Sequence, residues 1–175
     1  MIVGAVLAGG QSRRFGSDKA AAVFAGRTLL DHVVDALRPQ VDALLICGRA
    51  LPGFACVPDR PRAGLGPLGG LNAALHWAAA NGFDRVASAP CDAPGLPPDL
   101  VARLAACGAP ARLGGAPVVG LWPVTAAAAL DDWIAGPDRS LRGWGEKIGA
   151  TVLAGAVGNV NTPADLAALS GSDCG

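Results

Sequence analysis

The N-terminal part of the chain holds the feature that most constrains the fold, an apolar run that ends in a glycine-rich, basic loop. Residues 2–8 carry no polar side chain, which is typical of a strand buried on both faces of a parallel sheet. The run stops at Gly9-Gly10, and three cations follow closely: Arg13, Arg14 and Lys19. Glycine lets backbone N–H groups approach an anion because no Cβ blocks them, and the cations neutralise its charge. We therefore predict a loop that binds a nucleoside triphosphate at the carboxyl end of a first strand, where open α/β sheets bind ligands.

A solvated surface turn is the alternative for this loop, because glycine-rich turns and exposed basic residues are common. Gly16 is followed by Ser17-Asp18-Lys19, so the Walker pattern, in which lysine directly follows glycine, is absent. The dinucleotide fingerprint G-x-G-x-x-G is absent from this loop as well. The interleaving of three cations with glycines nevertheless favours phosphate binding, in a nucleotide site of neither common kind.

Strands and helices alternate along the rest of the chain. Apolar segments bounded by turn residues predict strands at residues 43–47, 55–57, 85–89, 118–122 and 151–153. Helical periodicity and capping residues predict helices at residues 28–37, 68–80, 97–107, 124–135, 140–148 and 162–169. This alternation predicts βαβ units, and so an α/β fold with a mostly parallel sheet and helices on both faces. The length suits a single domain over residues 1–175, with a loose tail at 170–175.

Composition excludes several classes of protein. The formal net charge is zero and only 16% of residues are charged, which argues against a general nucleic-acid or membrane-surface binder. Five scattered cysteines without C-x-x-C spacing indicate free thiols in a reducing compartment. No signal peptide is apparent, and the uncharged stretch 113–130 is interrupted by glycines and prolines, so no membrane span is expected. These features predict a cytoplasmic protein.

Asp92 is the best candidate for a metal ligand. It follows the predicted strand 85–89 and lies between Pro90 and Pro94, which stiffen the backbone. A triphosphate site needs Mg²⁺, and Mg²⁺ prefers oxygen ligands at the end of a rigid element. Aspartate at a strand end is often only a turn former or helix cap, but the basic loop favours the metal-binding interpretation.

Residues 7–19, with the sequence LAGGQSRRFGSDK, resemble the L-A-G-G-x-S-x-R-x-G-x-D-K signature of the molybdenum cofactor guanylyltransferases. Three later segments are also similar to motifs of that family. These are GPLGG at 66–70, which the family places beside the base, PCDAP at 90–94, its metal-binding motif, and NVNTP at 159–163, near the metal and the pterin. The resemblance extends from residue 7 to about residue 166. It implies the three-layer α/β/α sandwich of the nucleotide-diphospho-sugar transferases, a Rossmann-like fold.

The resemblance also implies the activity and its residues. The expected reaction transfers GMP from GTP to molybdopterin with Mg²⁺, releases pyrophosphate, and places molybdoenzymes or cofactor-delivery proteins among the partners. The catalytic residues would be Arg13, Lys19 and Asp92, with Asp92 on the metal. The nucleotide would be bound by Leu7, Ala8, Gly9, Gly10, Arg14, Lys19, Cys47, Asp59, Gly69 and Asp92. On the pterin side we expect Asn159, Asn161 and Arg139, although Arg139 and its basic neighbours are more typical of a solvated helix face.

Two positions depart from the family pattern. Cys47 stands where the family often has asparagine near the base, and Ala116-Pro117 replaces an expected histidine-proline pair. The alternatives are therefore a nucleotidyltransferase of the same fold that uses CTP or a sugar phosphate, and a nucleotide-binding adaptor without catalysis.

Overall fold

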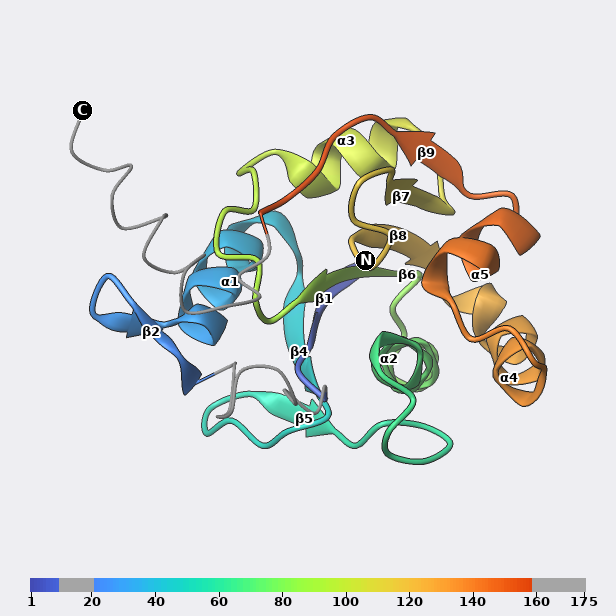
Figure 1. The fold of residues 1–175 in the computed structure, drawn as a ribbon, viewed down its shortest axis with the longest axis horizontal. Coiled ribbons are helices and arrows are strands. Elements are labelled where there is room, and N and C mark those ends of the chain that lie inside the picture. The colour runs from blue at the N-terminus through green and yellow to red at the C-terminus, as the bar shows by residue number, and fades with distance from the viewer. Residues whose placement is uncertain (10–20, 159–175) are drawn as a thin grey trace.

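The computed structural model describes residues 1–9 and 21–158, and its centre is a seven-stranded sheet (Figure 1). The strand order is β5-β4-β1-β6-β8-β7-β9. The strands are β1 (Ile2–Leu7), β4 (Ala43–Cys47), β5 (Ala55–Val57), β6 (Arg85–Pro90), β7 (Ala111–Leu113), β8 (Gly120–Pro123) and β9 (Thr151–Leu153). Strand β8 is antiparallel to its neighbours β6 and β7, and all other pairs are parallel. The predicted mostly parallel sheet is confirmed.

Helices cover both faces of the sheet (Figure 1). One face carries α1 (Leu29–Leu37) and α3 (Leu100–Ala106), and the other carries α2 (Pro67–Ala80), α4 (Ala127–Ala135) and α5 (Leu141–Lys147). Two short 3₁₀ turns, η2 (Arg38–Gln40) and η3 (Val124–Ala126), follow α1 and precede α4. The described part of the chain therefore forms a three-layer α/β/α sandwich, as expected.

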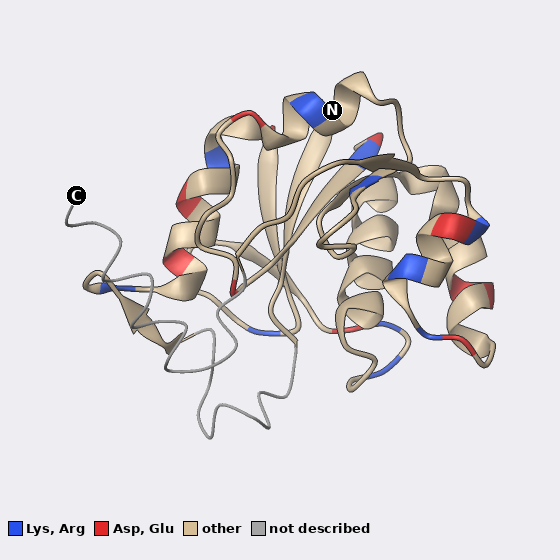
Figure 2. Cartoon of the chain, turned by 45° about the horizontal axis from the view of Figure 1, so that its top comes forward, with Lys and Arg blue, Asp and Glu red and all other residues tan. Residues whose placement is uncertain are grey.

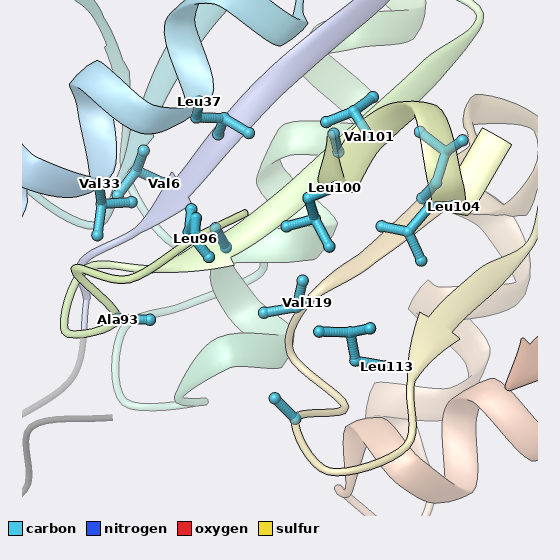
Figure 3. Packing of buried hydrophobic residues seen from close by; sticks show 14 of the residues in the cluster. Val6, Val33, Leu37, Ala93, Leu96, Leu100, Val101, Leu104, Leu113 and Val119 are labelled. Carbon is cyan, nitrogen blue, oxygen red and sulfur yellow. The ribbon is translucent and has the colours of Figure 1, made fainter. Parts of the chain in front are cut away.

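The apolar composition of β1 follows from its central place between these layers. Val3, Ala5 and Leu7 pack in the cluster beneath α2, whereas Val6 packs in the opposite cluster with Val33 of α1. Figure 3 shows this second cluster, in which side chains of α1 and α3 meet β1 and the segments around β7 and β8. Because both faces of the strand are covered, no polar position interrupts it.

Several predicted boundaries differ from those in the structure. The α3 helix begins at Leu100 rather than residue 97, β8 begins at Gly120 rather than residue 118, and the segment 124–135 divides into η3 and α4. Strand β7 was not predicted as a separate element, because it has three residues and its centre is the charged but buried Arg112. A small antiparallel hairpin of β2 (Val23–Phe24) and β3 (Arg27–Thr28) was also missed. The predicted helix 162–169 and tail 170–175 lie outside the described residues.

The predicted capping box at the start of α1 is confirmed. Thr28 Oγ1 accepts a hydrogen bond of 3.1 Å from the Asp31 N–H, and Asp31 Oδ2 accepts one of 3.2 Å from the Thr28 N–H. The Thr28 hydroxyl also donates to Asp31 Oδ2 at 2.7 Å, and this bond is the main reason why the pKa of Asp31 is lowered. The box positions the helix that covers β1.

Thr28→Ala is expected to lower the free energy of unfolding by about 1 kcal/mol, because the Asp31 N–H loses its acceptor, Thr28 Oγ1. Urea denaturation would measure the change. Thr125→Ala is the control, since Thr125 is exposed and lies within η3, which has no side-chain cap hydrogen bond. Equal losses for the two variants would contradict a capping contribution.

In the described ranges 1–9 and 21–158, no helix is both long enough and apolar enough to cross a membrane.

Candidate functional site

The chain segments that follow the parallel strands β1, β4, β5 and β6 are held side by side at the carboxyl ends of these strands (Figure 1). The ladder continues past the strand ends in three hydrogen bonds. Ala8 N–H donates to Cys47 O at 2.8 Å, Gly48 N–H to Val57 O at 2.8 Å, and Cys91 N–H to Leu7 O at 3.3 Å. These bonds bring together six of the residues predicted for the site: Leu7, Ala8, Gly9, Cys47, Asp59 and Asp92.

Four glycines close around the side chain of Asp59. A Cβ on Gly9 would lie 2.6 and 2.7 Å from the two Asp59 carboxyl oxygens, and one on Gly48 would lie 2.9 Å from Oδ1. A Cβ on Gly69 would lie 3.1 Å from Asp59 Cβ, and one on Gly70 would lie 3.7 Å from Oδ1. We call these four residues the glycine cradle. Side chains at the first two positions would displace the carboxyl group, so glycine is required there by close approach.

The carboxyl group of Asp59 contains a buried hydrogen-bond acceptor. Asp59 Oδ1 is buried, and no group in residues 1–9 or 21–158 donates a hydrogen bond to it. Burial raises the pKa of Asp59, because a desolvated carboxylate is disfavoured relative to the neutral acid. A buried acceptor left without a protein donor costs stability unless a ligand supplies one.

Asp59→Asn is expected to raise the free energy of unfolding at neutral pH, because it removes a charge that burial disfavours. The native state of the natural protein binds its proton more tightly than the unfolded state. Its stability therefore falls as pH rises from the ordinary range of aspartate through the raised pKa of Asp59. The gain from the variant should accordingly vanish below about pH 4, the usual aspartate range. Urea denaturation across pH would measure this, with Asp132→Asn as the control on an exposed carboxylate; a gain independent of pH would contradict the assignment.

A cavity of about 290 Å³ opens beside the glycine cradle, between the turn that follows β4 and the last residues of β5. Its lining combines apolar groups with backbone and one cation, in Gly48, Arg49, Ala50, Cys56, Val57 and Pro58. Gly48 belongs to both the cavity and the cradle, so a ligand in the cavity would lie next to Asp59.

Asp92 and Asp59 lie on opposite sides of the carboxyl end of β1. Sheet order places β6 next to β1, and the Cys91–Leu7 hydrogen bond holds the start of the Asp92 turn against that strand. Among residues 1–9 and 21–158, no three His, Cys, Asp or Glu side chains are grouped so as to hold a metal by themselves. Mg²⁺ is commonly held by one or two carboxylates together with substrate phosphates. A single carboxylate after β6, next to the end of β1, fits that kind of site.

The side chain of Cys47 points into the core instead of toward the open edge. It is fully buried in the cluster beneath α2, and a Cβ on Gly70 would lie 3.3 Å from Cys47 Cβ. Burial is the main reason why the pKa of this thiol is raised, so the sulfur stays protonated. Leu7 is buried in the same cluster. Both side chains pack against Gly70 in the first turns of α2.

Sequence reasoning overlooked Gly48, although a glycine directly after the second strand was a usable signal, whereas Gly70 belongs to the GPLGG segment expected beside the base. Arg139, predicted for the pterin side, is exposed in the loop between α4 and α5, on the α2 side of the sheet. Within the described residues, charged positions are spread over helices and loops without one continuous tract of either sign (Figure 2). The remaining predicted site residues lie outside the described ranges: Gly10, Arg13, Arg14, Lys19, Asn159 and Asn161.

Comparison with known proteins shows the family to which the chain belongs. The model of the MobA-like NTP transferase domain matches residues 4–151. A molybdenum cofactor guanylyltransferase of Acidiphilium cryptum is 39% identical over 184 residues, which cover 97% of this chain and 94% of the relative.

Solved structures share the fold. The molybdopterin-guanine dinucleotide biosynthesis protein A of Archaeoglobus fulgidus superposes with a TM-score of 0.75 at 20% identity, covering 98% of both chains. A Mycobacterium tuberculosis protein solved in complex with manganese superposes with a TM-score of 0.69, also at 20% identity and 98% coverage of both chains. At this level of identity the likeness extends to the fold alone.

Proposed function

Because this chain belongs to the MobA-like NTP transferase family, we propose that it transfers GMP from GTP to molybdopterin and releases pyrophosphate. The observation that carries the proposal is the buried Asp59 Oδ1 in the glycine cradle, which accepts no hydrogen bond from residues 1–9 or 21–158. We further propose that residues 1–175 form one nucleotidyltransferase domain that works in the cytoplasm and passes its product to molybdoenzymes or delivery proteins.

The base or ribose of GTP would donate hydrogen bonds to the Asp59 carboxyl group. Guanine carries N–H groups on N1 and N2, and a carboxylate accepts such donors well. The neighbouring cavity has Ala50, Val57 and Pro58 in its wall, which suits the apolar face of a purine. Asp59→Asn, expected to stabilise the protein, should therefore weaken GTP binding by about tenfold or more.

The phosphates of GTP would lie over the loop that follows β1. Backbone N–H groups of Gly9 and Gly10 would bind them, and Arg13, Arg14 and Lys19 would neutralise their charge. This arrangement stabilises the pyrophosphate as it leaves, which is where negative charge develops.

Asp92 would hold Mg²⁺ against the α-phosphate. When bound, the ion supplies charge stabilisation to the phosphate oxygens. Asp92 follows β6 and Asp59 follows β5, on opposite sides of β1 in the sheet. This separation suits a nucleotide whose base lies near Asp59 and whose phosphates lie near Asp92. The relative solved with manganese is consistent with a divalent ion in this fold.

The chemical step needs little from the protein beyond positioning. An oxygen of the terminal phosphate of molybdopterin attacks the α-phosphorus of GTP in line, and a new P–O bond forms. The bond from the α-phosphorus to the oxygen bridging to the β-phosphate breaks, and pyrophosphate leaves with the electron pair. A phosphate nucleophile is already ionised, so no general base is required. Asn159, Asn161 and Arg139 are proposed to contact the pterin side.

Pyrophosphate release tests the proposal directly. The protein is incubated with molybdopterin, Mg²⁺ and GTP, CTP, ATP or UTP in turn. We expect release with GTP only, and no release when molybdopterin is omitted. Release with CTP in place of GTP would favour a cytidylyltransferase, and binding of GTP without any release would indicate a nucleotide-binding adaptor.

A further inference from the structure

A second polar cluster lies between α2, α4 and the segment after β5, and its centre is Asp131 of α4. Asp131 Oδ1 accepts a hydrogen bond of 2.8 Å from Asn72 Nδ2, and Asp131 Oδ2 accepts one of 2.9 Å from His76 Nε2. The Arg60 guanidinium approaches the same carboxylate, with Nε 3.8 Å from Oδ1. One side chain on α4 therefore contacts two residues of α2 and the residue that follows Asp59.

The carboxylate is kept charged by these partners. Burial by itself would raise the pKa of Asp131, but hydrogen bonds from Asn72 and His76 and the charge of Arg60 outweigh it and lower the pKa. Asn72 is fully buried, and its Oδ1 has no hydrogen-bond partner among residues 1–9 and 21–158. The Asn72 amide is thus oriented by its bond to Asp131, because turning it round would place an oxygen against the carboxylate.

Arg60 contacts neighbouring elements through both its backbone and its side chain. Its N–H donates to Gly69 O at 3.1 Å, at the start of α2. Its side chain is half exposed and forms an ion pair with Asp131 of α4. Gly69 is also part of the glycine cradle, where a Cβ would lie 3.1 Å from Asp59 Cβ. The backbone of residues 59–60 is therefore fixed between the first turn of α2 and the side of α4.

We propose that Asp131 is a positioning residue for the nucleotide: it holds Arg60, and through Arg60 it keeps the Asp59 carboxyl group in the glycine cradle. The inference rests on the proposed function, since Asp59 is taken to bind GTP. A displaced Asp59 would weaken ground-state binding of the nucleotide more than it would slow the chemical step, which occurs at the phosphates. The expected signature is a raised KM for GTP with an unchanged kcat.

Asp131→Asn and Arg60→Gln test this separately and together. Each variant is expected to raise the KM for GTP by about fivefold, the range of a half-exposed ion pair, with kcat unchanged. The double variant should be no worse than either single variant, because both remove the same interaction. Asp132→Asn, on the same helix but exposed, should leave KM unchanged. The rise in melting temperature on adding GTP should shrink in parallel for both single variants.

Other outcomes would overturn the inference. Additive effects in the double variant would show that the two residues act independently, and a fall in kcat with unchanged KM would place Asp131 in another role. An unchanged KM in both single variants would show that Asp59 needs no such support. If Asp131→Asn does not fold, Arg60→Gln alone decides, because the Arg60 side chain is half exposed. Failure of the proposed function is distinguishable, since the natural protein would then release no pyrophosphate from GTP.

Discussion

Asp92→Ala is expected to lower the rate of pyrophosphate release from GTP by about a thousandfold or more, the effect of losing a metal's charge stabilisation. Among residues 1–9 and 21–158, no group of three acidic, histidine or cysteine side chains offers an alternative metal site. The loss should appear in kcat at saturating GTP and should not be restored by added Mg²⁺. Single-turnover assays with molybdopterin would measure it. Removal of divalent ions from the natural protein with a chelator should produce the same loss.

Asp99→Ala is the matched control for Asp92→Ala. Asp99 also follows β6 but is well exposed, and its carboxylate lies 3.8 Å from Arg103 in a surface pair. Exposed pairs contribute little, so this variant should keep the natural rate and stability. A near-natural rate for Asp92→Ala would remove the metal from the proposed site and with it the assignment of the PCDAP segment.

Gly48→Ala is expected to disrupt both the fold around the cradle and GTP binding. Gly48 has φ +84°, a conformation that costs an alanine about 1–2 kcal/mol by itself. In addition, the new Cβ would collide with Gly9 Cα and would lie 2.6 Å from Gly9 N and 2.9 Å from Asp59 Oδ1. Relief would require the segment after β1 to separate from that after β4, breaking the strand-end hydrogen bonds. Urea denaturation and GTP-dependent thermal shifts would measure the two losses.

Gly53→Ala separates backbone strain from collision. Gly53 lies in the same connection between β4 and β5 and has φ +83°, but nothing lies within 4 Å of a Cβ built there. The free energy of unfolding of Gly53→Ala should therefore fall only by the cost of the left-handed conformation. The variant should bind GTP normally. If the two variants lost equal stability and both still bound GTP, close packing of Gly9, Gly48 and Asp59 would not be needed for the site.

The elements with strong local signals were predicted well from the sequence. The apolar run of β1 and the capping box of α1 appear where expected, because a strand covered on both faces admits no polar residue and a cap depends on neighbours three positions apart. Strand β7 was not predicted, because it exists through its pairing with β8 and β9. Those partners are distant in sequence, so no local pattern around Arg112 indicates a buried strand. The predicted contact of Cys47 with the nucleotide remains a prediction, but its thiol is directed into the core.

The order of residues along the chain was enough to predict the strand-end aspartates and the alternation that produces a parallel sheet. It also predicts a phosphate-binding loop after the first strand, which stays a prediction. These features are local, because they depend on residues within a few positions of one another. Only the tertiary structure decided that four glycines from three separate segments surround Asp59, and that Asp131, far away in sequence, reaches Arg60. Such contacts depend on which strands become neighbours and on how closely a helix packs on them, and the packing energy that selects this arrangement belongs to the whole core rather than to any segment.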